Sequence, residues 1–195
     1  MSLNRILIRC KFLAALCLCA AAMSEAASAQ VWVASTGTVD PSSLSSTLFQ
    51  GQLVFIKPGL ATGTVTLRYN VLPVDDLTTV LTQPCCQSRE LVVRYMDNGP
   101  GAQVLVKLKR YNVNTGAVTT LLTFNSKDFP SQTAFQQPLP GPMSFFNFSF
   151  ADGPINGVSD QGGDSVYYIE ATLIRSASGG NPGLGSIRLV TALAP

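Results

Sequence analysis

The sequence predicts an all-β fold, an antiparallel β-sandwich of the jelly-roll-like or immunoglobulin-like kind, preceded by a cleaved helical signal peptide. Apolar and polar residues alternate through most of the chain after residue 30, which is the pattern of half-buried strands. Clusters of Gly and Pro separate these runs, and no long amphipathic helix is visible. Many short strands with such turns favour a sandwich. We therefore divide the 195 residues into a signal peptide, 1–29, and a single β-sandwich domain, 30–195.

The first 29 residues have the layout of a secretory leader. A basic start that ends at Lys11 precedes an apolar run at 12–23, and small residues then lead to Ala29 and Gln30. We place the cleavage between these two residues; a buried N-terminal helix is the alternative. The apolar run is shorter than the roughly 20 residues of a spanning helix. The sequence thus predicts export to the periplasm or the extracellular space, with no transmembrane segment in the mature chain.

Composition excludes several classes of activity. The chain contains no His, and only 12% of its residues are charged. Without an imidazole there is no Ser-His-Asp or Cys-His arrangement and no histidine ligand for zinc. Three of the 13 Lys and Arg residues and one of the 11 Asp and Glu residues lie in the predicted leader, so the remaining chain is formally neutral. A strongly basic surface for nucleic acid is therefore excluded too.

The first half of the mature chain contains a predicted helical turn and three strands. The turn follows Pro41, and the first strand is the apolar run 53–56. Alternation is clearest at 63–71, where Val65 and the apolar residues at every second position after it share one face. The run 90–96 is the third strand, and a cluster of turn-forming residues follows it.

The second half begins with a predicted β-hairpin. Its strands are 103–112 and 118–124, and Asn114-Thr115-Gly116 forms the turn between them. Three further alternating runs are predicted as strands; they are 143–150, 165–175 and 185–191.

Two cysteines remain after removal of the leader, the adjacent pair Cys85 and Cys86. Neighbouring Cα atoms are about 3.8 Å apart, below the usual disulfide range, so a vicinal disulfide would be strained. Four interpretations stay open: a vicinal disulfide, a reduced pair, bridges to another chain, and a soft-metal site of two thiolates. Preceding Pro84 and following polar residues place the pair in a loop.

One acidic, glycine-rich segment is a candidate calcium site. Asp152, Asn156, Asp160 and Asp164 recur at every fourth position with glycines between them. Calcium takes six to eight oxygen ligands, which a flexible loop with carboxylates can supply. The spacing matches neither an EF-hand loop nor the Gly-rich nonapeptide repeat, and the same residue types also build ordinary hairpin loops. We predict no other cofactor.

A polar sheet face is the candidate ligand surface. If the strands at 64–71, 90–96 and 103–112 are neighbours, they bring cationic and aromatic side chains together. The residues concerned are Arg68, Arg94, Lys107, Lys109 and Tyr111. Cations with an aromatic ring suit an acidic polysaccharide or a cell-envelope polymer. The alternative is a solvated face whose charges prevent sheet-edge pairing. Trp32, the only tryptophan, is predicted to anchor the first strand in the core rather than to stack on a sugar.

The sequence therefore predicts an exported, non-catalytic β-sandwich with a binding or structural role at the cell envelope or outside the cell. In one version of this hypothesis, the protein is a module that binds carbohydrate or an envelope polymer. Another is a self-assembling surface subunit, which would make the protein a homo-oligomer. A glycoside hydrolase that uses two carboxylates, with Glu90 and Glu170 as the only glutamates of the mature chain, is a remote third reading.

Overall fold

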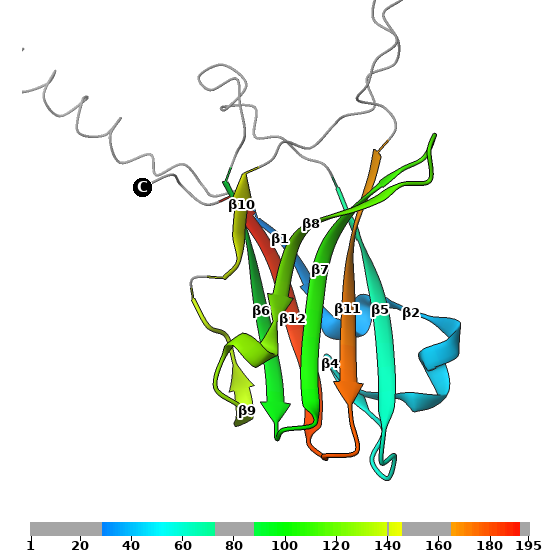
Figure 1. Cartoon of the computed structure of the whole chain (residues 1–195), viewed down its shortest axis with the longest axis vertical. Helices are drawn as coiled ribbons and strands as arrows, with labels where there is room; N and C mark the ends of the chain where they lie inside the picture. The colour runs from blue at the N-terminus through cyan, green and yellow to red at the C-terminus, as the bar shows by residue number, and fades with distance from the viewer. Residues whose placement is uncertain (1–28, 73–87, 140, 146–164, 192–195) are drawn as a thin grey trace, which may run out of the picture.

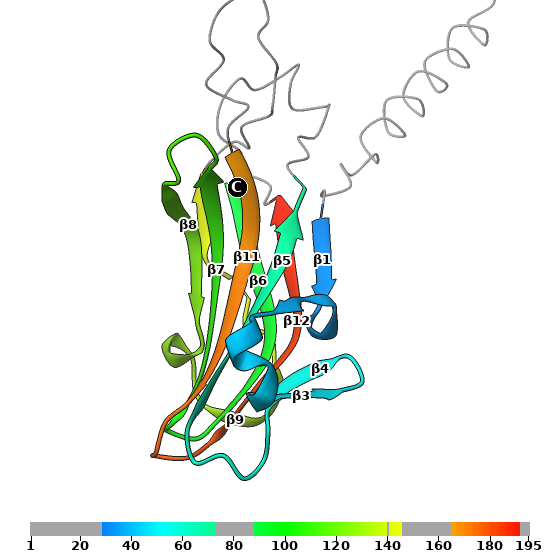
Figure 2. The same ribbon diagram turned by 90° about the vertical axis from the view of Figure 1, so that its right-hand side faces the viewer.

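The computed structural model describes residues 29–72, 88–139, 141–145 and 165–191. Two antiparallel sheets pack face to face, which confirms the predicted all-β sandwich. Figure 2 shows the two layers side by side, with the strands Ala102–Asn112 and Ser165–Arg175 in one layer and Asn181–Thr191 and Ala29–Val33 in the other. The seven-stranded sheet has the order β10 (Met143–Phe145), β6 (Ser88–Asn98), β12 (Asn181–Thr191), β4 (Leu53–Ile56), β3 (Thr47–Gln50), with β1 (Ala29–Val33) beside β12 and β9 (Gln132–Gln136) beside β6. The five-stranded sheet has the order β2 (Thr38–Val39), β5 (Gly63–Val71), β11 (Ser165–Arg175), β7 (Ala102–Asn112), β8 (Val118–Asn125).

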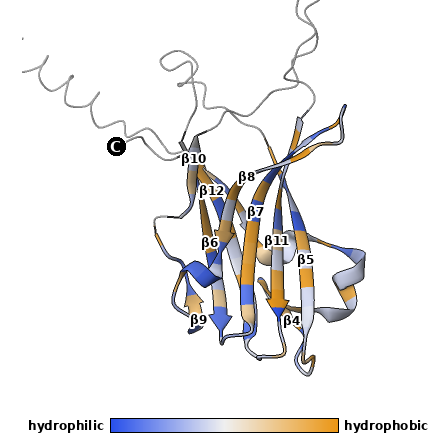
Figure 3. Ribbon diagram, in the orientation of Figure 1, coloured by the Kyte–Doolittle hydropathy of each residue, from blue (hydrophilic) through white to orange (hydrophobic). Residues whose placement is uncertain are grey.

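The core lies between the two sheets and is built by alternate residues of the long strands. On β5, for example, Val65, Leu67, Tyr69 and Val71 are all buried. The intervening residues of β5, β7 and β11 lie on the outer face of their sheet, and the hydropathy of these strands alternates accordingly (Figure 3). The opposite layer contributes the fully buried side chains Val54, Ile56, Leu91, Val93, Tyr95, Leu184 and Ile187.

Local signals in the sequence placed several elements correctly. The predicted hairpin is formed by β7 and β8, and Gly116 has the positive φ of 72° that its turn requires. The side chain of Asn112 accepts hydrogen bonds from the backbone N–H groups of Asn114 and Thr115. The predicted turn after Pro41 is the 3₁₀ helix η2 (Pro41–Ser46), whose N-cap residue is Asp40.

Other boundaries differ from the prediction. The strand predicted at 90–96 extends over Ser88–Asn98, and the last strand begins at Asn181 instead of 185. The prediction began that strand too late because Pro182 looked like a loop residue, although a proline is tolerated where a strand begins. Only the first three residues of the predicted strand 143–150 lie in β10, and its remainder is outside the described residues. The strands β2, β3 and β9 were not predicted, whereas β1 is the first strand that Trp32 was expected to anchor.

One end of the sandwich is closed by two turns that pack backbone against backbone. The β6–β7 and β11–β12 connections lie side by side there (Figure 1). A side chain at Gly101 would overlap the backbone of Gly179, and the Gly101 carbonyl accepts a hydrogen bond from the N–H of Ser176 at 2.8 Å. Gly101 is therefore required by the close approach of two backbones, and Gly179 by its positive φ of 79°.

Candidate binding surface

The structure brings four of the five predicted ligand residues together. Strands β5 and β7 belong to the same sheet, and β11 lies between them. Arg68 on β5 and Lys107, Lys109 and Tyr111 on β7 therefore share the outer face of the five-stranded sheet. Arg94 does not, because β6 belongs to the opposite sheet. The assumption that all three strands are neighbours was wrong, since alternation gives the face of a residue within its own sheet but not the partner of a strand.

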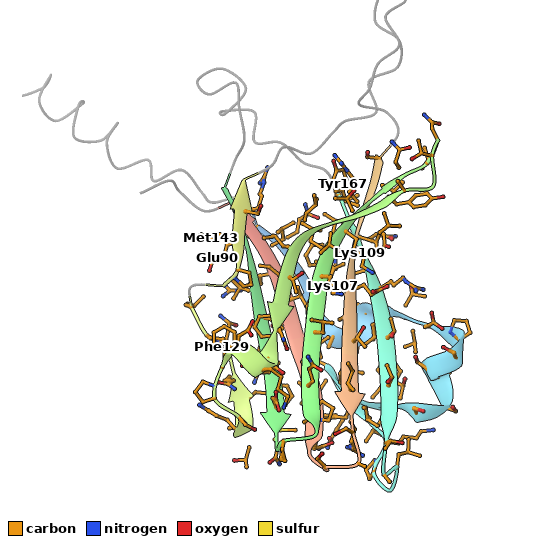
Figure 4. All side chains as sticks on the ribbon, viewed as in Figure 1. Glu90, Lys107, Lys109, Phe129, Met143 and Tyr167 are labelled. Carbon is orange, nitrogen blue, oxygen red and sulfur yellow. The ribbon has the colours of Figure 1, made fainter. Side chains whose placement is uncertain are left out.

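We call the outer face of β5, β11 and β7 around these residues the tyrosine–lysine face. The strand register orders it in three rows. Lys107 is opposite Glu170, which is opposite Arg68; the next row pairs Lys109 with Tyr168, and the last pairs Tyr111 with Val166. The two lysines project from the middle of β7 (Figure 4). The buried residues between them face the core.

Ion pairs neutralise most of the charge on this face. The guanidinium of Arg68 lies between two carboxylates, 3.2 Å from Asp40 Oδ2 and 3.6 Å from Glu170 Oε2. The other oxygen of Glu170, Oε1, accepts a hydrogen bond from Lys109 Nζ at 2.5 Å. Lys107 takes part in none of the ion pairs or hydrogen bonds within the described part of the chain. The face thus presents one unengaged ammonium group beside a neutralised network.

The position of Asp40 at the start of η2 lowers the pKa of its carboxyl group. The hydroxyl of Ser42 donates to Asp40 Oδ1 at 2.7 Å, and the Ser42 backbone N–H donates to the same oxygen at 3.1 Å. These two bonds, and then the charge of Arg68, lower the pKa of Asp40 below its usual value. Asp40 therefore stays charged and holds Arg68 in place down to low pH.

Exposed apolar side chains continue the face beyond the charged rows. Tyr111 is 37% exposed, and its neighbours Val118 on β8 and Val166 on β11 are 51% and 50% exposed. An aromatic ring that keeps this much surface in water, next to a row of fixed charges, can stack on a flat ligand.

Sequence reasoning missed three residues of the face, namely Glu170, Tyr168 and Asp40. The alternation of the strand at 165–175 already separates Tyr168 and Glu170 from the core-facing residues. The missing information was the register, which places Glu170 opposite both Lys107 and Arg68. Asp40 comes near Arg68 only through the pairing of β2 with β5, which no local pattern indicates.

The two glutamates do not form a catalytic pair. Glu90 lies on the outer face of the seven-stranded sheet, where its Oε1 accepts a hydrogen bond from the N–H of Gly141 at 2.5 Å (Figure 4). Glu170 lies on the outer face of the other sheet, so the core separates the two carboxylates. A glycosidase needs both on the two sides of one bond, which this arrangement does not provide.

Two predicted sites lie outside the described residues. They are the cysteine pair Cys85 and Cys86 and the calcium candidate Asp152, Asn156, Asp160 and Asp164. Both stay predictions. Within the described ranges, no group of three or more Cys, Asp or Glu side chains is arranged to hold a metal ion, and no helix there has the length and apolar character needed to span a membrane.

Trp32 packs against the core from β1, as predicted, and its indole N–H is engaged by a backbone carbonyl. It therefore has a structural role in the sandwich. The ring is not a free stacking platform.

No protein-family model matches the sequence, and no curated protein sequence matches it. Among solved structures, the chain is similar to a GH26-CBM35 β-(1,4)-mannanase of Podospora anserina, with 15% identity and a TM-score of 0.40 over 86% of this chain and 28% of that one. Another similar structure belongs to a study of carbohydrate-binding modules of the β-sandwich superfamily, with 9% identity and a TM-score of 0.39 over 88% of this chain and 58% of that one. A third is the family 11 carbohydrate-binding module of cellulosomal cellulase Lic26A-Cel5E of Clostridium thermocellum, with 11% identity and a TM-score of 0.37 over 88% of this chain and 86% of that one. TM-scores of 0.40 and below establish neither family nor function for this chain.

Proposed function

We propose that this chain is an exported, non-catalytic β-sandwich protein that acts by binding a polysaccharide on its tyrosine–lysine face. The observation that carries the proposal is the row arrangement of that face. Tyr168 lies opposite Lys109, and Tyr111 follows Lys109 on the same side of β7. Rings and charged hydrogen-bonding groups therefore alternate on one rigid sheet, which is the combination that sugar rings and their hydroxyls require.

The spacing of this face suits a chain of sugars. Residues two apart on one strand face are about 7 Å apart along the strand, so Tyr111, Lys109 and Lys107 offer successive contacts along β7. Because these side chains come from a hydrogen-bonded sheet rather than from loops, their positions are fixed before binding. Preorganisation of this kind reduces the entropy lost on association.

The ion pairs on this face change the ligand charge that we expect. The sequence suggested an acidic polymer, but Glu170 and Asp40 already compensate Arg68 and Lys109. We infer that this face takes an uncharged, hydroxyl-rich polysaccharide, for which Lys107 and Glu170 supply a donor and an acceptor.

Non-catalytic action is part of the same proposal. It is supported by the absence of His from the sequence and by the location of the two glutamates on opposite sheets. The expected leader supports export. Cleavage after Ala29 would remove only the first residue of β1, so the processed chain would keep the rest of that strand. Periplasmic or extracellular location follows from export, and mass spectrometry of the mature protein tests the cleavage site.

A screen of soluble polysaccharides by affinity electrophoresis tests the binding proposal. The panel contains uncharged polymers, such as hydroxyethylcellulose, dextran and galactomannan, beside an acidic one. We expect retardation by an uncharged polymer and its loss in Tyr111→Ala. The control is Val31→Ala, an exposed side chain on the opposite sheet that is 58% accessible, and it should keep the retardation. Equal retardation of both variants, or none by any uncharged polymer, would reject the proposed surface.

Self-assembly is the second candidate function, and one observation favours it. Strand β8 is an edge of the five-stranded sheet, and its eight residues carry no charge. Such an edge is a template for strand pairing with another chain. Size-exclusion chromatography with light scattering tests it: a Thr119→Lys variant should dissociate any oligomer built on β8, and a monomeric wild-type protein would exclude it.

A further inference from the structure

The outer face of the seven-stranded sheet carries two arginines that form no ion pair with the acidic side chains of the described residues. Arg94 is on β6 and Arg188 is on β12. This differs from the tyrosine–lysine face, where Arg68 lies between two carboxylates. The guanidinium groups of Arg94 and Arg188 are therefore available to an external anion.

The strand register places these arginines within reach of one another. Ser186 of β12 is opposite Arg94, and Arg188 is opposite Val92. Arg94 and Arg188 are therefore diagonal neighbours on adjacent strands, about 7–8 Å apart at the backbone. Val93 and Ile187 are buried against the core, so the side chains of both arginines and of Ser186 lie on the outer face. Two long side chains with this separation can converge on one anionic group.

Aromatic packing holds Arg94 in place. Its guanidinium carbon lies 5.0 Å from the centre of the Phe135 ring, and Phe135 in turn contacts Phe55 edge to face at 6.0 Å. The missing side chain of Gly185 makes room, because a Cβ there would be 3.2 Å from Arg94 Nη1. The Arg94 side chain is exposed, and its guanidinium lies over β12 beside Gly185, where the Phe135 ring supports it. A cation fixed on a ring loses little side-chain entropy when it binds.

We propose that Arg94, Arg188 and Ser186, with Phe135 beneath Arg94, form an anion-binding site for the carboxylate of an acidic sugar, a uronate residue of a polysaccharide. We call these four residues the arginine patch. The planar guanidinium of Arg94 offers paired N–H donors that match the two oxygens of a carboxylate. Arg188 adds a second cation, and the Ser186 hydroxyl adds a donor between them. This site is separate from the tyrosine–lysine face, because the core lies between the two sheets, and it does not rest on the proposed function.

Isothermal titration calorimetry at low salt tests the patch with two probes, a short oligogalacturonate and its methyl ester. The ester keeps the sugar rings and removes the charge. We expect the acid to bind and the ester to bind at least about tenfold more weakly, which corresponds to the loss of a charge-assisted bond. Arg94→Gln and Arg188→Gln should each weaken binding of the acid about tenfold. The matched control is Lys57→Gln, which removes an exposed cation from the loop after β4 and should leave binding of the acid unchanged. Lys107→Gln, on the opposite face, is measured beside it.

Circular dichroism melting of each variant establishes that it is folded, and Arg94→Lys is the second variant at that position. It keeps the charge but loses the paired donors, so its affinity should fall between those of wild type and Arg94→Gln. Equal binding of acid and ester would overturn the proposal, as would an unchanged affinity in both arginine variants. A loss in Lys107→Gln alone would place the acid on the other sheet and would overturn it too. Failure of the uncharged polymers in the earlier screen would leave this result unaffected, so the two proposals fail separately.

Discussion

The indole N–H of Trp32 donates a hydrogen bond to the backbone carbonyl of Asn70 at 3.0 Å. Trp32 belongs to β1 of one sheet and Asn70 to β5 of the other, so this bond joins the two layers at their shared margin. Gln30 repeats the arrangement two residues earlier. Its side-chain amide donates to the Leu72 carbonyl at 2.5 Å and accepts from the Leu72 N–H at 2.9 Å. The side chains of β1 thereby occupy backbone groups at the end of β5 that would otherwise invite pairing with another chain.

Replacement of Trp32 measures how much this hydrogen bond and the packing of the indole ring contribute to the free energy of unfolding. Trp32→Ala should lower the free energy of unfolding by roughly 2–4 kcal/mol, because it removes a large side chain that packs against the core. Trp32→Phe keeps an aromatic ring and loses the N–H, so its cost should be about 1 kcal/mol. Urea denaturation of both variants gives the two values. No cost in Trp32→Phe would show that the bond to Asn70 contributes nothing.

Two buried tyrosines should respond in opposite ways to loss of their hydroxyl groups. The hydroxyl of Tyr69 donates to the Ala34 carbonyl at 2.8 Å, whereas that of Tyr95 has no hydrogen-bond partner among the described residues. Tyr69→Phe should therefore cost about 1 kcal/mol, and Tyr95→Phe should be neutral or stabilising. Thermal or urea unfolding of the pair measures the difference, and a larger cost at Tyr95 would contradict it.

The same tyrosine gives a spectroscopic prediction. Burial, and then the nearby charges of Asp97 and Asp128, raise the pKa of Tyr95 to about 12. The folded state thus favours the protonated phenol, and this preference reduces stability once the pH exceeds the ordinary tyrosine pKa of 10.0. Ultraviolet titration of wild type and Tyr95→Phe should differ by one phenolate that forms only near this high pH. A difference that appears near 10.0 would show that Tyr95 is solvated.

Asp40 should make stability depend on pH in the acidic range. Its pKa is lower in the folded protein, so the contribution of its charge is present above the ordinary value of 3.8 and is lost as the pH falls below that value. Asp40→Asn keeps an N-cap acceptor and removes the charge. We expect it to be less stable than wild type at neutral pH and nearly equal to it in acid. The reverse order in urea titrations would contradict this linkage.

Gly101 should tolerate no side chain. A Cβ there would overlap the Gly179 backbone in the adjacent turn, so Gly101→Ala should cost about 1–3 kcal/mol through forced displacement of one turn. Gly51→Asn is the control, because nothing lies within 4 Å of a Cβ there and Asn accepts the φ of 61°. Equal melting temperatures for the two variants would contradict the close packing of the turns.

The sequence predicted the local order of this protein better than its long-range pairing. Alternation placed Tyr69 and Val71 in the core and Arg68 outside, because side-chain direction along a strand follows from the backbone itself. The hairpin at Asn112–Gly116 was also predictable, since its turn chemistry is contiguous. Partnerships across the fold were not predictable. The prediction grouped β6 with β5 and β7, whereas β6 belongs to the opposite sheet, which removes Arg94 from the candidate site.

Short strands escaped prediction for a related reason. Residues Thr38 and Val39 form a two-residue strand only because β5 lies beside them, and neither carries a signal of its own. Glu170 illustrates the same limit at the functional level. Its partners Lys109 and Arg68 are far away in the chain and become adjacent through the order β5, β11, β7.

Chemical-shift mapping of the labelled protein with the oligosaccharide that a glycan array selects tests the central proposal most directly. If the outer face of the five-stranded sheet is the ligand surface, the largest amide shifts should cluster at Lys107, Lys109, Tyr111 and Tyr168, and the oligosaccharide should remain intact throughout the titration. Shifts confined to other elements, or progressive cleavage of the oligosaccharide, would contradict a non-catalytic binding protein that uses this face.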